Sequence, residues 1–127
     1  MRIILFIIGL SFIIHPGEVR GNEEDKMKLK LTGDCKNCSL QEINLSGKDL
    51  SRANLNRANL TNANLSEVNL SYAVLSEANL SYADLSEANL KYARLYKIHL
   101  TNANLSKANL SGVVSLCKAN LKYANLS

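Results

Sequence analysis

Two cysteines at close spacing are the first residues that could do chemistry. The stretch Cys35-Lys36-Asn37-Cys38 is the single C-x-x-C of the 127-residue chain. Such a pair can form a disulfide, exchange electrons as a dithiol, or supply two of the four ligands of a zinc ion. No βαβ pattern of a thioredoxin-like enzyme surrounds it, so a disulfide or two small buried thiols are favoured. A thiol redox or metal protein acting through Cys35 and Cys38 stays as an alternative.

No arrangement of residues predicts an enzyme. The two histidines, His15 and His99, lie far apart in the sequence, and His99 takes a place that asparagine usually fills in a repeated pattern. The serines and carboxylates recur with the same pattern, so none of them stands out as a nucleophile or an acid. We therefore expect a non-enzymatic protein that needs no cofactor and no metal.

A repeat of five residues organises most of the chain. Leucine recurs every fifth residue from Leu40 to Leu110 and again at Leu116, Leu121 and Leu126, which makes eighteen units. Two places before leucine stand twelve alanines, and one place before it stand eleven asparagines and two aspartates. Serine or threonine commonly follows leucine, and these residue types favour bends and local hydrogen bonds to the backbone.

A period of five fits neither a helix nor a continuous strand. On an α-helix each step of five advances a side chain by roughly 140°, so the leucines would scatter around the axis. In an unbroken strand an odd spacing would place successive leucines on opposite faces. The pattern fits short Ala-x-Leu strands with both apolar side chains inward, each followed by a corner. The core stack expected from this register is Leu55, Leu60, Leu65, Leu70, Leu75, Leu80, Leu85, Leu90, Leu95, Leu100, Leu105 and Leu110.

The tandem motif A-[ND]-L-[ST]-x resembles the pentapeptide-repeat family. The match covers residues 35–127. The resemblance implies an all-β fold, a right-handed quadrilateral parallel β-helix in which four pentapeptides make one coil, with about four and a half coils here. In the register of the repeat, Cys35 takes a leucine place and Cys38 an alanine place, so both should point inward. Cys117 falls at an outward corner as a free thiol or an intermolecular bridge.

The first 34 residues differ from the repeat. Arg2 precedes the apolar run Ile3 to Ile14, which is too short for a membrane span and typical of a secretory signal. We predict a signal peptide at 1–21 and hence an exported protein of the bacterial periplasm, cell envelope or exterior. A short uncleaved membrane anchor is the alternative. Residues 22–34 are expected to be a linker or a cap strand with Met27, Leu29 and Leu31 turned inward.

Outward side chains twenty residues apart should stack on one face. Arg52, Tyr72 and Tyr92 then form a column that is a possible surface contact for a partner, although aromatic cover of a flat sheet explains them as well. Among the charged residues, Arg57 and Glu77 should form a ladder ion pair, and so should Glu87 and Lys107, each contributing little stability.

Net charge disfavours one function that the resemblance suggests. Some pentapeptide-repeat proteins act on DNA gyrase by presenting an acidic rod that resembles duplex DNA. Here residues 39–127 hold nine basic and six acidic residues. The sign and the export signal both argue against a DNA-mimic modulator of gyrase or topoisomerase, which stays as an alternative. Nucleic-acid binding is disfavoured because the basic excess is modest.

The last coil suggests self-association. Its leucines, Leu116, Leu121 and Leu126, would be uncovered, so we expect a homodimer formed end to end there. Just before it, Leu110 and Leu116 are six residues apart, so one extra residue must bulge outward, with Val114 expected in the alanine place. The sequence predicts a structural or protein-interaction scaffold whose protein partner is unknown.

Overall fold

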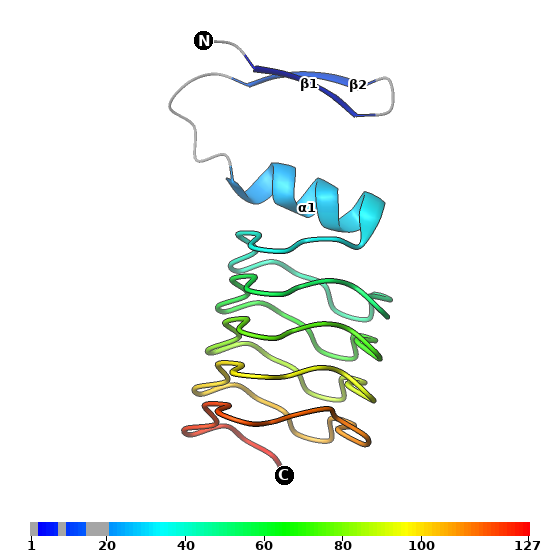
Figure 1. Cartoon of the computed structure of the whole chain (residues 1–127). Helices are drawn as coiled ribbons and strands as arrows, with labels where there is room; N and C mark the ends of the chain where they lie inside the picture. Colours follow the sequence, from blue (N-terminus) through cyan, green and yellow to red (C-terminus); the bar gives the residue numbers. More distant parts are fainter. Residues whose placement is uncertain (1–2, 8–9, 15–20) are drawn as a thin grey trace.

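The computed structural model describes residues 3–7, 10–14 and 21–127. Two short strands, β1 (Ile3–Ile7) and β2 (Leu10–Ile14), come first, and the helix α1 (Gly21–Thr32) follows. From Asp34 onward the chain winds into a stack of coils (Figure 1). Helix α1 lies across the N-terminal end of this stack, and the chain ends at the opposite end of the stack (Figure 1).

Strands β1 and β2 form an antiparallel hairpin that pairs Ile3 with Ile14 and Ile7 with Leu10. Among the labelled elements, these two strands contact only each other. Part of the predicted signal segment, at 1–2, 8–9 and 15–20, lies outside the described residues, so the signal peptide stays a prediction. In the described part of the chain no helix is both long and apolar enough to cross a bilayer.

The expected cap strand is wrong, because residues 21–32 form a helix. The alternation of Met27, Leu29 and Leu31 resembled a strand, but most of the segment is made of the helix-forming residues Glu, Lys, Met and Leu. Acidic residues in its first turn and Lys30 in its last turn suit the helix dipole. As a helix, it buries Leu29 and leaves Leu31 43% exposed.

Helix α1 covers the first coil and supplies partners that a preceding coil would otherwise give. Leu29 is 3% exposed and belongs to the same apolar cluster as the coil interior. The Asp25 carboxylate accepts a hydrogen bond of 2.7 Å from the backbone N–H of Ser39. Gly33, in the left-handed region at φ 67°, ends the helix with a bond from its N–H to the Leu29 carbonyl.

Each coil of the stack contains twenty residues. Parallel bridges join residues twenty apart, from Asp34 and Asn54 to Arg94 and Val114. Each side of a coil donates three backbone hydrogen bonds to its neighbours, as around Leu55. The N–H groups of Leu55 and Arg57 donate to the carbonyls of Val74 and Ser76 in the following coil, at 2.8 and 3.0 Å. The N–H of Asn54 donates to the Gly33 carbonyl before it, at 2.8 Å. Residues 34–127 therefore make about four and a half coils.

The corners are tight turns with a left-handed residue. Ala58 N–H donates back to the Leu55 carbonyl at 3.0 Å, and the intervening Arg57 has φ 58°. The second residue after each leucine repeats this positive φ in non-glycine residues such as Glu67, Tyr72 and Lys107. A negative φ followed by a positive φ is the pattern of a type II turn, which usually has glycine or asparagine at the second place.

Where asparagine precedes leucine, its side chain accepts from the one backbone N–H that bonds neither to a neighbouring coil nor across the corner. Asn64 Oδ1 accepts from the backbone N–H of Ser66 at 3.1 Å, and the same bond recurs from Asn69 to Ser71. Aspartate does the same, since Asp84 accepts from Ser86 at 3.0 Å. The amide groups also join coils, as where Asn104 Nδ2 donates to Asp84. This bonding explains why asparagine and aspartate share the place.

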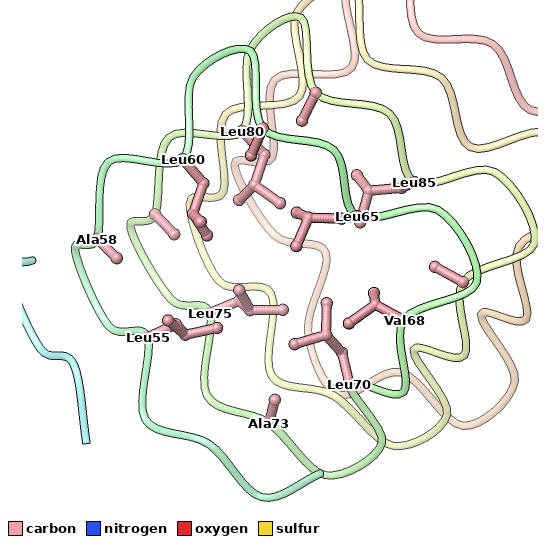
Figure 2. Packing of buried hydrophobic residues seen from close by; sticks show 14 of the residues in the cluster. Leu55, Ala58, Leu60, Leu65, Val68, Leu70, Ala73, Leu75, Leu80 and Leu85 are labelled. Atoms are coloured by element: carbon pink, nitrogen blue, oxygen red, sulfur yellow. The ribbon is translucent and has the colours of Figure 1, made fainter. Parts of the chain in front are cut away.

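The interior is an apolar stack of leucine with a smaller residue, mostly alanine and in places valine or isoleucine. The leucines from Leu55 to Leu105 named in the expected core stack are at most 2% exposed, and Leu110 is partly buried. Figure 2 shows Leu55, Leu60, Leu65, Leu70 and their successors pointing from the four sides toward a common axis. No charged or polar residue is buried among the side chains that the structure describes.

The extra residue lies in the last coil, and its identity corrects the expected register. Bridges are twenty residues apart up to Arg94 and Val114, then twenty-one apart at His99 and Asn120. Ser115 is the insertion, with φ 66°. Val113 takes the alanine place, because its N–H donates to the Leu110 carbonyl, and Val114 is left outward and 53% exposed.

We expect Leu75→Ala to lower the free energy of unfolding by about 2–5 kcal/mol, because the change leaves a cavity where neighbouring coils cannot collapse. Leu126→Ala removes the same atoms from a side chain that is 56% exposed and is the matched control. It should cost less than about 1 kcal/mol. Urea unfolding followed by circular dichroism measures both variants, and equal losses would contradict the continuous core.

Candidate functional site

Cys35 and Cys38 form a disulfide beneath α1. Their Cα atoms are 5.2 Å apart, and the two residues are 0% and 3% exposed. The Cys35 sulfur also lies 3.2 Å from the Asp25 carbonyl oxygen of α1. The bridge thus closes the first turn of the coil stack under its cap. Cys117 lies at the other end of the stack as an exposed free thiol.

The predicted surface column is a continuous stack of side chains. The Tyr72 and Tyr92 ring centroids are 5.0 Å apart, and the Arg52 guanidinium lies 5.9 Å from the Tyr72 centroid. Gly112 continues the column, and a Cβ there would collide with the Tyr92 ring. Tyr72 and Tyr92 remain 53% and 41% exposed. The Tyr92 ring therefore covers the corner at Gly112, and both rings remain partly open to solvent.

Charged side chains on the other corners pair along the stack. Arg57 Nε donates to Glu77 at 3.0 Å, and Lys107 Nζ lies 3.3 Å from a Glu87 oxygen. The hydrogen bond from Arg57, with the charges of Arg57 and Lys97, lowers the pKa of Glu77. The backbone N–H of Ser51 chiefly lowers the pKa of Asp49, helped by the Ser51 hydroxyl and the Asn69 amide.

A groove of about 570 Å³ lies between α1 and the first coil. Leu29, Leu45 and Leu50 line it, together with Lys26 and Lys48. Lys48 takes an inward alanine place of the repeat but is exposed here, because the groove lets its long side chain reach solvent. The groove thus accommodates the one charged residue that interrupts the inner pattern of the repeat.

The last coil exposes part of its leucine row. Leu116 and Leu126 are 43% and 56% exposed, while Leu121 packs partly against the core. His99 lies outward on the side of a coil and is exposed. Within the described residues no group of three or more potential metal-ligating side chains comes together.

Sequence reasoning missed the surface around Tyr96. Lys97 Nζ lies 5.2 Å from the Tyr96 ring centroid, and Lys91 Nζ lies 5.2 Å from that of Tyr92. Arg94 lies between the two tyrosines in the sequence and is exposed. The signal that could have found this surface is the replacement of asparagine by arginine before Leu95.

Comparison with known proteins identifies the repeat. The family model described as pentapeptide repeats matches the chain in eight copies, at residues 34–71, 58–95, 69–106, 83–114 and 93–127. The chain belongs to the pentapeptide-repeat family. Pentapeptide-repeat proteins of known structure form right-handed quadrilateral β-helices. No curated protein matches the sequence closely enough to count as a relative.

Two solved pentapeptide-repeat proteins share the fold clearly. HetL, involved in heterocyst differentiation regulation in the cyanobacterium Nostoc sp. strain PCC 7120, is 33% identical with a TM-score of 0.61 over 72% of this chain and 48% of its own. The chain thus spans about half the length of HetL. Rfr23 of the cyanobacterium Cyanothece 51142 is 26% identical with a TM-score of 0.60, over 82% of this chain and 94% of its own.

We expect this pentapeptide-repeat protein to lose stability in acid. The folded-state pKa of Asp49 lies below its ordinary 3.8, so its carboxylate stabilises the fold above that value and the contribution is lost as the pH falls through the folded pKa. Asp49→Asn keeps an oxygen for the Ser51 N–H and should flatten the decline of the melting temperature below about pH 4. Ser51→Ala keeps the backbone donor, so the melting temperature of this variant should fall with pH nearly as that of the unchanged protein does. Thermal unfolding by circular dichroism at several pH values measures this, and parallel curves for Asp49→Asn and the unchanged protein would contradict it.

Proposed function

We propose that this protein is an exported, non-enzymatic scaffold that binds another protein through the outward side chains of its coils. The observation that supports the proposal is that different places of each repeat have different structural roles. Leucine and alanine fill a closed interior, and asparagine and serine satisfy the corners. The remaining outward places vary without disturbing the ladder, so they are free to form a recognition surface.

The chemistry of the described surface agrees with binding rather than catalysis. The cysteine pair is oxidised and buried, and His99 stands on a coil side with asparagines before and after it in its column. The relative HetL is described as taking part in the regulation of heterocyst differentiation, a role compatible with binding a partner. A rigid rod with variable sides suits a protein that holds a partner in place.

Export is the part of the proposal that rests on the N-terminal sequence. The basic residue Arg2 followed by the apolar run Ile3 to Ile14 is the arrangement that secretion machinery reads. A disulfide between Cys35 and Cys38 suits an oxidising compartment outside the cytosol.

Fractionation of bacterial cells that produce the full chain tests export. We expect the protein in the periplasmic or extracellular fraction, with an N-terminus near Asn22 by mass spectrometry. A variant without residues 2–21 is the control and should stay in the cytosol. Full-length protein in the cytosol would contradict the proposal, and full-length protein in the membrane fraction would favour an uncleaved anchor.

Self-association through the last coil is a separate prediction. The exposed Leu116 and Leu126 offer a second copy an apolar surface. We expect sedimentation velocity to show a dimer at high concentration and Leu116→Glu to shift it to monomer, because a charge cannot be buried unpaired between two coils. Leu31→Glu is the matched control, since Leu31 is equally exposed at 43% on α1. A monomer at all concentrations would contradict this.

A further inference from the structure

One side of the coil stack departs from the repeat pattern. The four columns of residues that precede leucine are mostly asparagine or aspartate, but one column reads Asp34, Asn54, Val74, Arg94 and Val114. Its last three members carry no side-chain acceptor for the corner N–H that asparagine satisfies elsewhere. The bulge at Ser115 falls on the same side, in the coil below Arg94. A place where local rules are broken without a structural gain is where function is expected.

Charge is also segregated along the stack. From residue 88 to residue 127 the chain has six basic residues and no aspartate or glutamate, whereas residues 23–87 have seven basic and ten acidic residues. Arg94, Lys97 and Lys118 belong to the irregular side, and Lys91 borders it beside Tyr92. The overall charge of the coils hides this local excess, because the acidic residues lie in the earlier coils.

We propose that this surface, called here the basic face, binds an acidic protein segment. The basic face consists of Tyr92, Arg94, Tyr96, Lys97, Val114 and Lys118. The inference rests on the proposed scaffold role and names the chemistry of the partner. Arginine and tyrosine around an apolar side chain are the residue types that dominate the energy of protein interfaces. Val114, at 53% exposed, and Tyr96, at 37% exposed, supply the apolar part.

The rings are poorly placed to stack on nucleic-acid bases. Tyr92 is stacked between Tyr72 and the backbone at Gly112, with Lys91 near its ring. One side of the Tyr96 ring faces the Lys97 ammonium at 5.2 Å. Single-strand binding needs ring faces open to successive bases. Carboxylates of a protein segment need only the charged groups of the face, of which Arg94 and Lys118 are exposed and Lys97 is half-buried. Apolar side chains of that segment can cover Val114.

Restoring the repeat pattern provides a test in which binding should weaken while stability is kept or increased. Arg94→Asn returns the usual acceptor for the Tyr96 N–H, and Lys97→Asn places asparagine at a left-handed corner, as Asn62 and Asn102 already are. The double variant should therefore unfold at the same or a higher temperature than the unchanged protein. Lys107→Asn with Lys122→Asn removes the same charge from other sides of the same coils and is the matched control.

Fluorescence anisotropy with a labelled peptide of alternating glutamate and leucine measures binding. We expect the Arg94→Asn, Lys97→Asn variant to bind about tenfold more weakly, the control variant to change less than about twofold, and binding to weaken as salt rises to about 0.5 M. Equal losses in both variants, or no binding of the peptide to the unchanged protein, would overturn the proposal. Tighter binding of oligothymidylate or of phosphatidylglycerol vesicles than of the peptide would also overturn it.

A crosslinking experiment separates the face from the scaffold role. Cys117 lies beside the basic face and can carry a photoreactive maleimide, while Cys35 and Cys38 are held in their disulfide. Ser66→Cys combined with Cys117→Ser moves the label to the opposite side of the stack. In an extract of the source cells, we expect an acidic protein to be captured from Cys117 and not from position 66, with capture lost in the Arg94→Asn, Lys97→Asn variant. Capture only from position 66 would overturn the face and leave the scaffold role standing, and capture from neither position would overturn both.

Discussion

Hydrogen bonds between successive coils are the constraint on which the rest of the structure depends. In each repeat three backbone N–H groups pair with a neighbouring coil and a fourth closes the corner, as around Leu65 and Val68. The fifth, after leucine, is satisfied by the preceding side chain where that residue is asparagine or aspartate, as by Asn64. Because buried or partly buried donors are rarely left unpaired, the chain turns a corner every five residues and returns to the same side of the stack every twenty. The small inner cross-section that results is filled by leucine and a smaller apolar residue, chiefly alanine, with Val68, Ile43 and Ile98 as larger variants.

The same ladder forces many ordinary residues into a conformation that they normally avoid. Glutamate, tyrosine, lysine and arginine stand at left-handed corners, at a cost of roughly 1–2 kcal/mol for each residue that has a Cβ. Their N–H groups donate to the next coil, as Glu77 does to Tyr96 at 2.8 Å, so the pairing offsets the strain. A corner fixed in this way points its side chain outward at every coil. Columns of outward side chains such as Tyr72 and Tyr92 therefore follow from the ladder alone.

Because the interior of the stack is nearly uniform, features that distinguish this protein from other repeats of the same kind must lie at its ends and on its outer sides. At the first end, Asp25 and Leu29 of α1 replace the missing coil, one by a hydrogen bond to Ser39 and the other by packing. On the sides, most residues before leucine are asparagine because it satisfies a corner N–H. Where another residue stands in that place, fold stability does not explain the choice. Val74, Arg94 and Val114 share one column, and this clustering separates the basic face from the regular sides.

Much of the fold follows from the sequence because the period of five leaves few alternatives. Leucine spacing placed the core, and the six-residue step after Leu110 placed the bulge. The helical cap did not follow, because the alternation of Met27, Leu29 and Leu31 resembles a strand. Packing of Leu29 against the first coil and the hydrogen bond that Asp25 accepts from Ser39 favour the helix. The basic face was also missed, because a net charge counted along the chain does not show which residues meet across coils twenty apart. Sequence by itself determined the repeating interior, since every unit obeys the same local rule, and only the stacking in three dimensions decided which outward residues became neighbours.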